Sequence, residues 1–179
     1  MKLIILDRDG VINHESAEFV KSADEWEALP GSIEAIAQLY HAGYKIVVAT
    51  NQSGLGRGLF SIHDLNAMHK KLQTLLKGLG ASIDAFFICP HHPEENCDCR
   101  KPLPGMFNEI KKRYAISDAS QFLAVGDSLR DLQAASTAGF RTCLVLTGNG
   151  QKTLAKGDLP TGTVVHNNLL EVAEKLLET

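Results

Sequence analysis

Short apolar runs alternate along this chain with segments in which apolar residues recur every three or four positions. Runs with the length and composition of buried strands occupy residues 3–6, 44–50, 83–89, 122–126 and 142–146, with a shorter one near 164–165. Helical spacing marks residues 32–42, 62–79, 105–114, 130–138 and the segment from 169 onward. Strands that alternate with helices predict an α/β fold, a doubly wound parallel sheet with helices on both faces.

The segment 62–79 carries the clearest helical pattern. Ser61 and Asp64 resemble a capping box at its start. The residues predicted to face the core are Leu65, Met68, Leu72, Leu75 and Leu79. Residues 10–30, 51–58 and most of those after 146 show no clear period, so we expect loops there.

Composition places the chain among ordinary globular proteins. Its 179 residues, 44% hydrophobic and 22% charged, suit a single domain, 1–179, with a core large enough to need no disulfide framework. The net charge of −3 argues against a nucleic-acid or anionic-membrane partner. We find no run of 18 apolar residues and no signal-peptide pattern after Lys2, so we expect a cytoplasmic protein, and a monomer.

An acidic pair follows the first predicted strand. Side chains two apart on an extended backbone point the same way, so Asp7 and Asp9 are predicted to face one pocket while Arg8 faces away. Two adjacent carboxylates are tolerated when a divalent cation lies between them or when one is protonated. Both conditions suit an enzyme with one nucleophilic Asp and one acid/base Asp. The alternative is an Asp-Gly turn with solvated carboxylates.

Further polar residues follow other predicted strands. Thr50 and Asp127 lie at two strand ends, and Lys101 comes shortly after the third strand. Ligands of doubly wound sheets bind beyond the carboxyl ends of the strands. The shared placement therefore favours one active site over a set of unrelated surface residues.

The chain has four cysteines, and three of them lie between positions 89 and 99. Cys89, Cys97 and Cys99, with a histidine between, have the spacing of a structural tetrahedral zinc site, for which His91 and His92 are equally placed. Free thiols or a surface disulfide are the alternatives. The loop ends immediately before Arg100 and Lys101, so zinc here would fix where the lysine points. Cys143, in a predicted strand, is expected to be a small buried hydrophobe.

The ordered set Asp-x-Asp-Gly-Val at 7–11, Thr50, Lys101 and Gly126-Asp127 with Asp131 resembles the haloacid dehalogenase superfamily, over residues 3 to about 146. The resemblance implies a phosphatase in which Asp7 attacks phosphorus and forms an aspartyl-phosphate. Asp9 then acts as acid and base. Mg²⁺ is held by the Asp7 carboxylate, the Asp9 backbone carbonyl and Asp127.

The same resemblance implies contacts with the transferred phosphate from Thr50 and Lys101. Asp131 lies one helical turn after Asp127 and orients either a metal-bound water or Lys101, or else is an exposed carboxylate at a helix start. Residues 10–30 are too few for a cap domain, so we expect an open site and a small substrate.

The cysteine loop also resembles that of the heptose bisphosphate phosphatases and the histidinol-phosphate phosphatases, in which the histidine beside the proline, here His91, is the zinc ligand. Some heptose enzymes carry lysine where this chain has Ser128. The remaining predicted substrate contacts are Asn51, Gln52, Ser53, Arg57 and Arg100.

An Arg-Gly pair after Asn-Gln-Ser-Gly resembles the heptose enzymes. The implied substrate is a small phosphorylated sugar, D-glycero-D-manno-heptose 1,7-bisphosphate, which loses its 7-phosphate while Arg57, Arg100 or both bind the 1-phosphate. Histidinol phosphate or another small sugar phosphate is the alternative.

Proteins of other classes fit the sequence less well. A receiver-type signalling module places its phosphorylated Asp on a middle strand, whereas Asp7 ends the first strand with Asp9 beside it. A zinc-ribbon nucleic-acid module requires basic residues beside the zinc ligands, whereas this loop holds Glu94, Glu95 and Asp98. A phosphotransferase uses the same intermediate and remains open.

Overall fold

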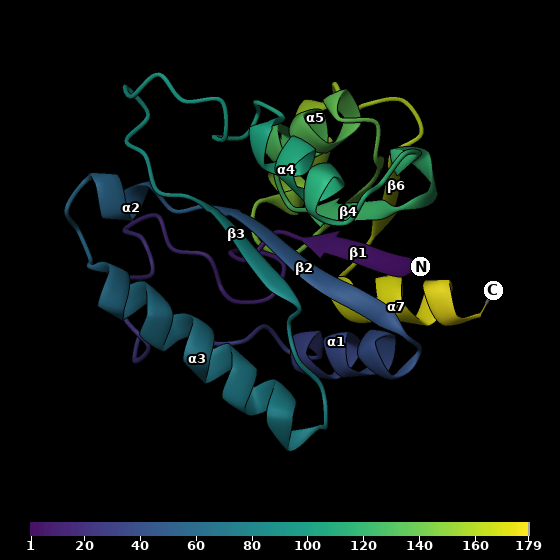
Figure 1. Cartoon of the computed structure of the whole chain (residues 1–179), viewed down its shortest axis with the longest axis horizontal. Helices are drawn as coiled ribbons and strands as arrows, with labels where there is room; N and C mark the ends of the chain where they lie inside the picture. Colours follow the sequence, from purple (N-terminus) through teal and green to yellow (C-terminus); the bar gives the residue numbers. More distant parts are fainter. Residues whose placement is uncertain (179) are drawn as a thin grey trace.

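The computed structural model describes residues 1–178 of the chain, which build one six-stranded parallel sheet in the order β3-β2-β1-β4-β5-β6 (Figure 1). The strands are β1 Lys2–Leu6, β2 Tyr44–Asn51, β3 Ala85–Cys89, β4 Leu123–Gly126, β5 Arg141–Val145 and β6 Val164–His166. Every neighbouring pair is parallel. The predicted doubly wound α/β fold is therefore confirmed.

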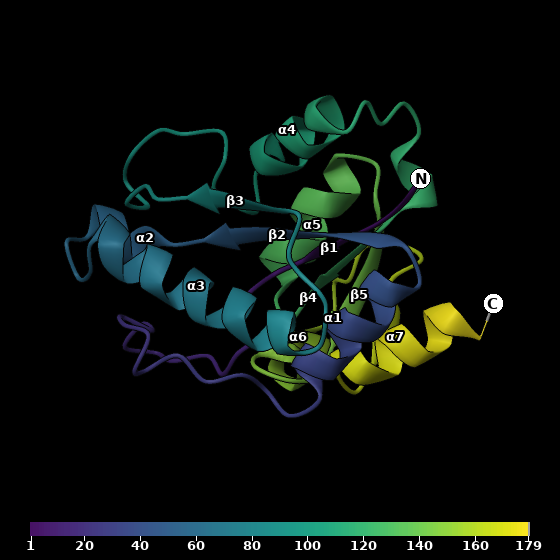
Figure 2. The same cartoon turned by 60° about the horizontal axis from the view of Figure 1, so that its bottom comes forward.

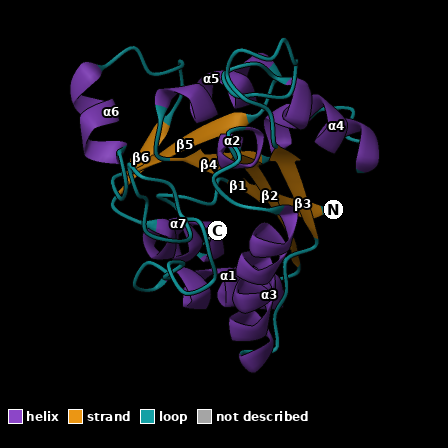
Figure 3. Ribbon diagram, turned by 90° about the vertical axis from the view of Figure 1, so that its left-hand side faces the viewer, coloured by secondary structure: helices purple, strands orange, loops and turns teal. Residues whose placement is uncertain are grey.

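Helices cover both faces of the sheet (Figures 2 and 3). The helices are α1 Ser32–His41, α2 Ser53–Gly56, α3 Ile62–Gly78, α4 Gly105–Arg113, α5 Leu129–Thr137, α6 Gly150–Lys156 and α7 Leu169–Leu177. Helices α1, α3 and α7 lie on one face, and α4 and α5 lie on the other. Helices cover both faces because the strands are apolar on both faces. In β1 alternate side chains point to opposite sides, so Ile4 and Leu6 pack into one apolar cluster and Leu3 and Ile5 into the other.

The strand order reverses between β1 and β4, and that reversal positions the site. Asp7 follows β1 and its N–H donates to the Val125 carbonyl of β4 at 2.9 Å, while Asp127 follows β4 directly. In a doubly wound sheet this switch point opens a crevice at the carboxyl edge, because the adjoining crossovers leave to opposite faces. Figure 3 views this edge, with α2 in front of the strands.

Two expectations about helices were wrong. Helices α2 and α6 lie in segments expected to be loops, because four and seven residues hold too few turns to show a period. Leu75 on α3 and Leu79, which caps its C-terminus, are 42% and 45% exposed, whereas Leu76 is buried. The buried stripe follows the 3.6-residue repeat through His69 and Leu76. The capping box between Ser61 and Asp64 is confirmed.

Residues 10–30 contain no helix or strand and therefore no cap domain. Isolated bridges join Asn13 to Asp9 and to Ala28. The Nζ of Lys71 on α3 donates to the carbonyls of Ala23 and Trp26 at 2.7 Å each, which holds the segment against the domain. Within residues 1–178, no helix has the length and apolar character needed to cross a bilayer.

Candidate active site

The buried ammonium of Lys101 lies between two carboxylates. Its Nζ is 2.9 Å from Asp7 Oδ1 and 2.6 Å from Asp131 Oδ1, and it donates to the Ala49 carbonyl at 2.9 Å. Burial disfavours the charge on Lys101, but Asp131 and Asp7 outweigh it and raise the pKa of this lysine. Burial likewise acts against ionisation of Asp131, but Lys101 outweighs it and lowers the pKa of this carboxyl. Lys101 is therefore a charged, fixed group beside Asp7.

Asp131 is not the exposed carboxylate that was one of the expected alternatives, because it is only 4% exposed. Its Oδ2 accepts from the N–H of Ser128 at 3.1 Å and from the Ser128 hydroxyl at 2.7 Å, which caps α5. Its other oxygen, Oδ1, forms the ion pair with Lys101. The geometry agrees with the alternative in which Asp131 orients Lys101.

A third carboxylate, that of Asp127, lies close to this group. Carboxylate oxygens of Asp7, Asp127 and Asp131 all lie within 4.8 Å of one another. Burial and the neighbouring carboxylates raise the pKa of Asp127 to about 8. Burial and then Asp131 raise the pKa of Asp7 to about 7, despite Lys101. The cluster therefore holds more negative charge than its own cation balances.

Glycine is required next to this cluster. Gly10 has a φ of +85°, and a Cβ atom there would lie 2.0 Å from Asp127 Oδ2. Asp127 Oδ2 accepts from the N–H of Asn149 at 2.8 Å, and the Asp127 carbonyl accepts from the Thr153 hydroxyl. The backbone after Asp9 therefore packs directly against Asp127.

The amide of Asn51 fixes the backbone of Lys101. Asn51 Oδ1 accepts from the Lys101 N–H at 3.0 Å, and Asn51 Nδ2 donates to the Lys101 carbonyl at 3.1 Å. This pairing joins the end of β2 to the end of the cysteine loop. Asn51, predicted as a substrate contact, therefore also positions Lys101.

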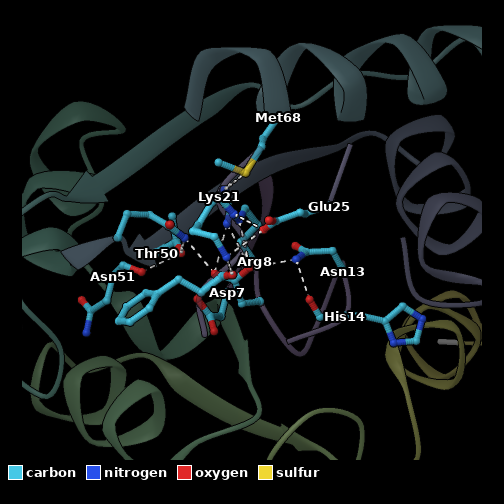
Figure 4. Close-up of polar contacts among 12 residues, drawn as sticks. Asp7, Arg8, Asn13, His14, Lys21, Glu25, Thr50, Asn51 and Met68 are labelled. Atoms are coloured by element: carbon cyan, nitrogen blue, oxygen red, sulfur yellow. Dashed lines mark hydrogen bonds and ion pairs between the residues drawn. The ribbon is translucent and has the colours of Figure 1, made fainter. Parts of the chain in front are cut away.

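The expectation that Arg8 faces away from the acidic pair was wrong (Figure 4). The Arg8 side chain is fully buried and turns back to Asp9, with Nη2 3.0 Å from Oδ1 and 3.2 Å from Oδ2. Strand alternation fixes only the direction of the Cβ atom, and the arginine stem is long enough to return. Asp9 also accepts from Asn13 Nδ2 and Gln52 Nε2, each at 2.8 Å.

The side chain of Gln52 links Thr50 to Asp9. Gln52 Nε2 donates to the Thr50 hydroxyl at 3.0 Å as well as to Asp9, and both residues are almost fully buried. Gln52 is thus tied to the acidic pair. Thr50 lies at the strand end, as predicted.

A cavity of about 290 Å³ opens beside Asp9. Its lining residues are Asp9, Glu15, Ser16, Ala17, Phe19, Val20, Asn51, Gln52, Ser53, Arg57, Arg100 and Arg130. A smaller pocket with Asp7, Asp127 and Lys101 in its wall shares Asp9, Glu15, Asn51 and Arg130 with it. The cavity therefore leads from the arginines to the acidic cluster.

The three arginines are close enough to influence one another. Burial, then the positive charge of Arg130 and, more weakly, that of Arg57, lowers the pKa of Arg100. Within residues 1–178, Arg100 Nη1 is buried without a hydrogen-bond partner. Arg57 Nε donates to the Ser53 hydroxyl at 3.4 Å. The Arg57 guanidinium stacks over Phe19, with Cζ 5.6 Å from the ring centroid. This wall suits an anionic ligand.

Sequence reasoning missed Arg130, Glu15 and Phe19 as cavity residues. Arg130 had a usable signal, because it lies in the first turn of a helix that starts directly after Asp127. Glu15 and Phe19 lie in the aperiodic segment 10–30, whose path follows from tertiary contacts.

The cysteine loop gathers its four predicted ligands. Cys89 Sγ lies 3.8 Å from Cys97 Sγ and 3.6 Å from His91 Nδ1, and His91 Nδ1 lies 3.2 Å from Cys99 Sγ. The structure thus selects His91, while the His92 ring nitrogen accepts from the Glu94 N–H. Among the described residues all four cysteines are free, and Cys143 is buried in β5 as expected.

Comparison with known proteins agrees with this geometry. The family model described as polynucleotide kinase 3 phosphatase matches residues 2–145. A curated D-glycero-beta-D-manno-heptose-1,7-bisphosphate 7-phosphatase from Bordetella bronchiseptica is 59% identical over 178 residues, 99% of each chain. One of the same name from Neisseria meningitidis serogroup A is 48% identical over 180 residues, covering 99% of this chain and 96% of the relative.

Two solved structures of heptose bisphosphate phosphatases are also similar to this chain. The D,D-heptose 1,7-bisphosphate phosphatase of B. bronchiseptica, complexed with magnesium and phosphate, superposes with a TM-score of 0.98 at 59% identity over 99% of both chains. A D,D-heptose 1,7-bisphosphate phosphatase from Burkholderia thailandensis is 50% identical, with a TM-score of 0.79 over the full length of both chains. The chain therefore belongs to the haloacid dehalogenase superfamily and, within it, to the family of the heptose bisphosphate phosphatases.

Proposed function

We propose that the protein is a magnesium-dependent phosphatase that removes the 7-phosphate of D-glycero-β-D-manno-heptose 1,7-bisphosphate. The observation that carries the proposal is the cavity with Arg57, Arg100 and Arg130 in its wall, which leads to Asp7 and Asp9. A bisphosphate needs positive charge at two places: the three arginines supply it at one end of the cavity, and Lys101 with a bound Mg²⁺ would supply it at the other. The relatives' names support the β-anomer.

The acidic cluster fits Mg²⁺. Hard oxygen ligands in octahedral geometry lie roughly 3–4 Å apart around this ion, and carboxylate oxygens of Asp7 and Asp127 lie within 4.8 Å of each other. The surplus negative charge of the cluster is a second indication. We assign the Asp7 carboxylate, the Asp9 backbone carbonyl and Asp127 as ligands. Bound Mg²⁺ supplies positive charge that reduces repulsion between Asp7 and a phosphate.

The proposed reaction starts with a free oxygen of Asp7. This oxygen attacks phosphorus, the bond from phosphorus to the sugar oxygen breaks, and Asp9 gives its proton to that oxygen. Asp9 then takes a proton from water, whose oxygen displaces Asp7 and releases phosphate. Lys101 and the Thr50 hydroxyl stabilise the charge on the phosphate oxygens. Asp131 and Asn51 hold Lys101 in place.

At the other end of the substrate, we assign Arg100, Arg57 and Arg130 to the retained 1-phosphate. Arg100 Nη1 is a buried donor that needs an acceptor. Ser53 supports Arg57 through a hydrogen bond, and Phe19 supports it by stacking. Histidinol phosphate, the alternative substrate, carries a cationic amine at its far end, which three guanidinium groups would repel.

Arg100→Ala tests this assignment. The expected result is a loss of about 10- to 100-fold in kcat/KM for the heptose 1,7-bisphosphate and little change for heptose 7-phosphate, which lacks the 1-phosphate. The wild-type enzyme should prefer the bisphosphate over histidinol phosphate. Arg141→Ala, at the exposed start of β5 on the opposite edge of the sheet, is the matched control.

Two results would contradict the assignment. One is a higher kcat/KM for histidinol phosphate than for the bisphosphate. The other is an equal effect of Arg100→Ala on the bisphosphate and the monophosphate, because an arginine that holds the 1-phosphate acts only when that group is present.

The cysteine loop is proposed to hold one structural Zn²⁺ through Cys89, His91, Cys97 and Cys99. A tetrahedral ion with Zn–S bonds near 2.3 Å requires sulfur atoms about 3.8 Å apart, and the Cys89 and Cys97 sulfurs have that separation. Because the loop runs directly into Arg100 and Lys101, the ion would fix both residues.

Cys97→Ser is expected to lose the zinc and to lower kcat, because the end of the loop that carries Lys101 is then less restrained. Cys143→Ala, which changes a cysteine in β5, should keep both metal and activity. Elemental analysis of protein never exposed to chelator gives the measurement. Substantially less than one zinc per wild-type chain would rule out the site.

We further infer that residues 1–179 act as a single monomeric phosphatase domain in the cytoplasm. The groups assigned to the proposed chemistry, Asp7, Asp9, Asp127 and Lys101, gather at one edge of one sheet. The net charge of −3 argues against a nucleic-acid partner.

A further inference from the structure

Arg8 is a charged side chain with no exposed surface, and its whole guanidinium is engaged. Its Nε and Nη2 point to the Asp9 carboxylate, and Nη1 lies 3.3 Å from His69 Nε2 and 3.8 Å from Met68 Sδ. Figure 4 shows the Met68 side chain of α3 reaching toward Arg8. A buried guanidinium held at every nitrogen has little rotational freedom.

His69 is the residue that fixes the far side of Arg8. It is 7% exposed and stacks on Phe86 of β3, with ring centroids 4.1 Å apart and planes 9° apart. Burial and then the charge of Arg8 lower the pKa of His69 to about 4, so its ring is neutral at neutral pH. Arginine has no acceptor atom, so His69 Nε2 must accept the hydrogen bond from Arg8 Nη1. The ring proton of His69 is therefore on Nδ1.

Asp9, by contrast, is partly open. Its side chain is 26% exposed and faces the cavity, where it has to reach the leaving oxygen. A general acid works only when its carboxyl is held within a few tenths of an ångström of the productive position. The contacts from Arg8, whose side chain has no exposed surface, reach both carboxylate oxygens.

We propose that Arg8 and His69 are positioning residues for the acid/base Asp9: His69 on α3 holds the Arg8 guanidinium, and Arg8 holds the orientation of the Asp9 carboxylate. This inference rests on the proposed function, in which Asp9 protonates the leaving sugar oxygen. It extends the catalytic machinery to the core face of α3. Asn13 and Gln52 also donate to Asp9, so loss of His69 should weaken the orientation without abolishing it.

The test compares leaving groups. A sugar alkoxide needs a proton when it leaves, whereas 2,4-dinitrophenolate does not, so misplacement of Asp9 should slow formation of the aspartyl-phosphate only for the sugar phosphate. The second step, in which Asp9 acts as a base, is common to both substrates, so the comparison uses kcat/KM, which reports the first step. His69→Leu is expected to lower kcat/KM for the heptose bisphosphate about 10-fold and for 2,4-dinitrophenyl phosphate less than about 2-fold. His69→Gln, which again offers an acceptor, should recover most of the loss.

Controls separate positioning from packing. His63→Leu changes an exposed histidine of the same helix, and Met68→Leu changes the other neighbour of Arg8 with little change in volume. Both should leave the ratio between the two substrates unchanged. If His69→Leu does not fold, Arg8→Lys carries the test, because a lysine keeps the charge but cannot hold both oxygens of Asp9.

Asp9→Asn, measured on the same two substrates, shows which proposal fails. If Asp9→Asn lowers kcat/KM selectively for the sugar phosphate while His69→Leu and Arg8→Lys lower kcat/KM for both substrates equally or for neither, the positioning role is overturned and the proposed function stands. If Asp9→Asn itself shows no selectivity, Asp9 is not the general acid and both proposals fall.

Discussion

Asp7→Asn is expected to lower kcat for hydrolysis of the heptose bisphosphate by at least about 10³-fold, because an amide cannot attack phosphorus. The side chain keeps its size, and Asn can still accept from Lys101 Nζ, which lies 2.9 Å from Asp7 Oδ1. One negative charge also leaves a cluster in which Asp7, Asp127 and Asp131 repel one another. The variant should therefore fold, with its defect confined to chemistry and metal binding.

Steady-state phosphate release, with a thermal melt of the same samples, gives the measurement. Asp24→Asn, in the exposed part of the segment 10–30, is the control for the chemical change and should match the wild type. Asp9→Asn should also lose most of its activity. If hydrolysis of the aspartyl-phosphate slows more than its formation, phosphoprotein should accumulate. A folded Asp7→Asn enzyme with near-normal turnover would exclude the covalent mechanism.

Lys101→Met is expected to abolish activity and to lower the free energy of unfolding by roughly 3–5 kcal/mol, the usual cost of removing one partner from a buried ion pair. The Lys101 side chain is 1% exposed and its ammonium compensates Asp7 and Asp131, so an apolar side chain of similar length leaves two largely buried carboxylates without their cation. Urea unfolding in chelated buffer measures this cost without a contribution from bound metal.

A double-mutant cycle tests the physical reason. Adding Asp131→Asn to Lys101→Met removes one uncompensated carboxylate, so the double variant should regain stability relative to Lys101→Met while staying inactive. Asp131→Asn alone should be destabilised, because it leaves Lys101 with Asp7 as its remaining carboxylate within ion-pair distance. Strictly additive losses of stability would contradict a shared electrostatic cluster.

Most of the fold could be predicted from the sequence. Parallel strands buried on both faces must be apolar throughout, and crossover helices must show a 3.6-residue period, so both patterns are visible in a single sequence. Errors arose where an element is too short to show its period, as in α2 and α6, or where the repeat drifts, as between Leu75 and Leu76 on α3. Both reflect packing rather than local preference.

The chain by itself also determined which residues meet at the carboxyl edge. Asp7, Thr50, Asp127 and the residues after the third strand were predictable because parallel strands end at one edge of the sheet. The cysteine ligands were predictable from spacing, although His91 and His92 could be separated only by resemblance or by structure.

Only the tertiary structure decided the directions of the long side chains. Arg8 reverses toward Asp9, His69 is a buried neighbour of that pair from a helix some 60 residues away, and Arg130 joins the cavity wall. The physical reason is that strand and helix periods fix only the directions of the Cα–Cβ bonds. A guanidinium lies four bonds beyond Cβ, and its position depends on where a buried charge can find hydrogen-bond and ion-pair partners.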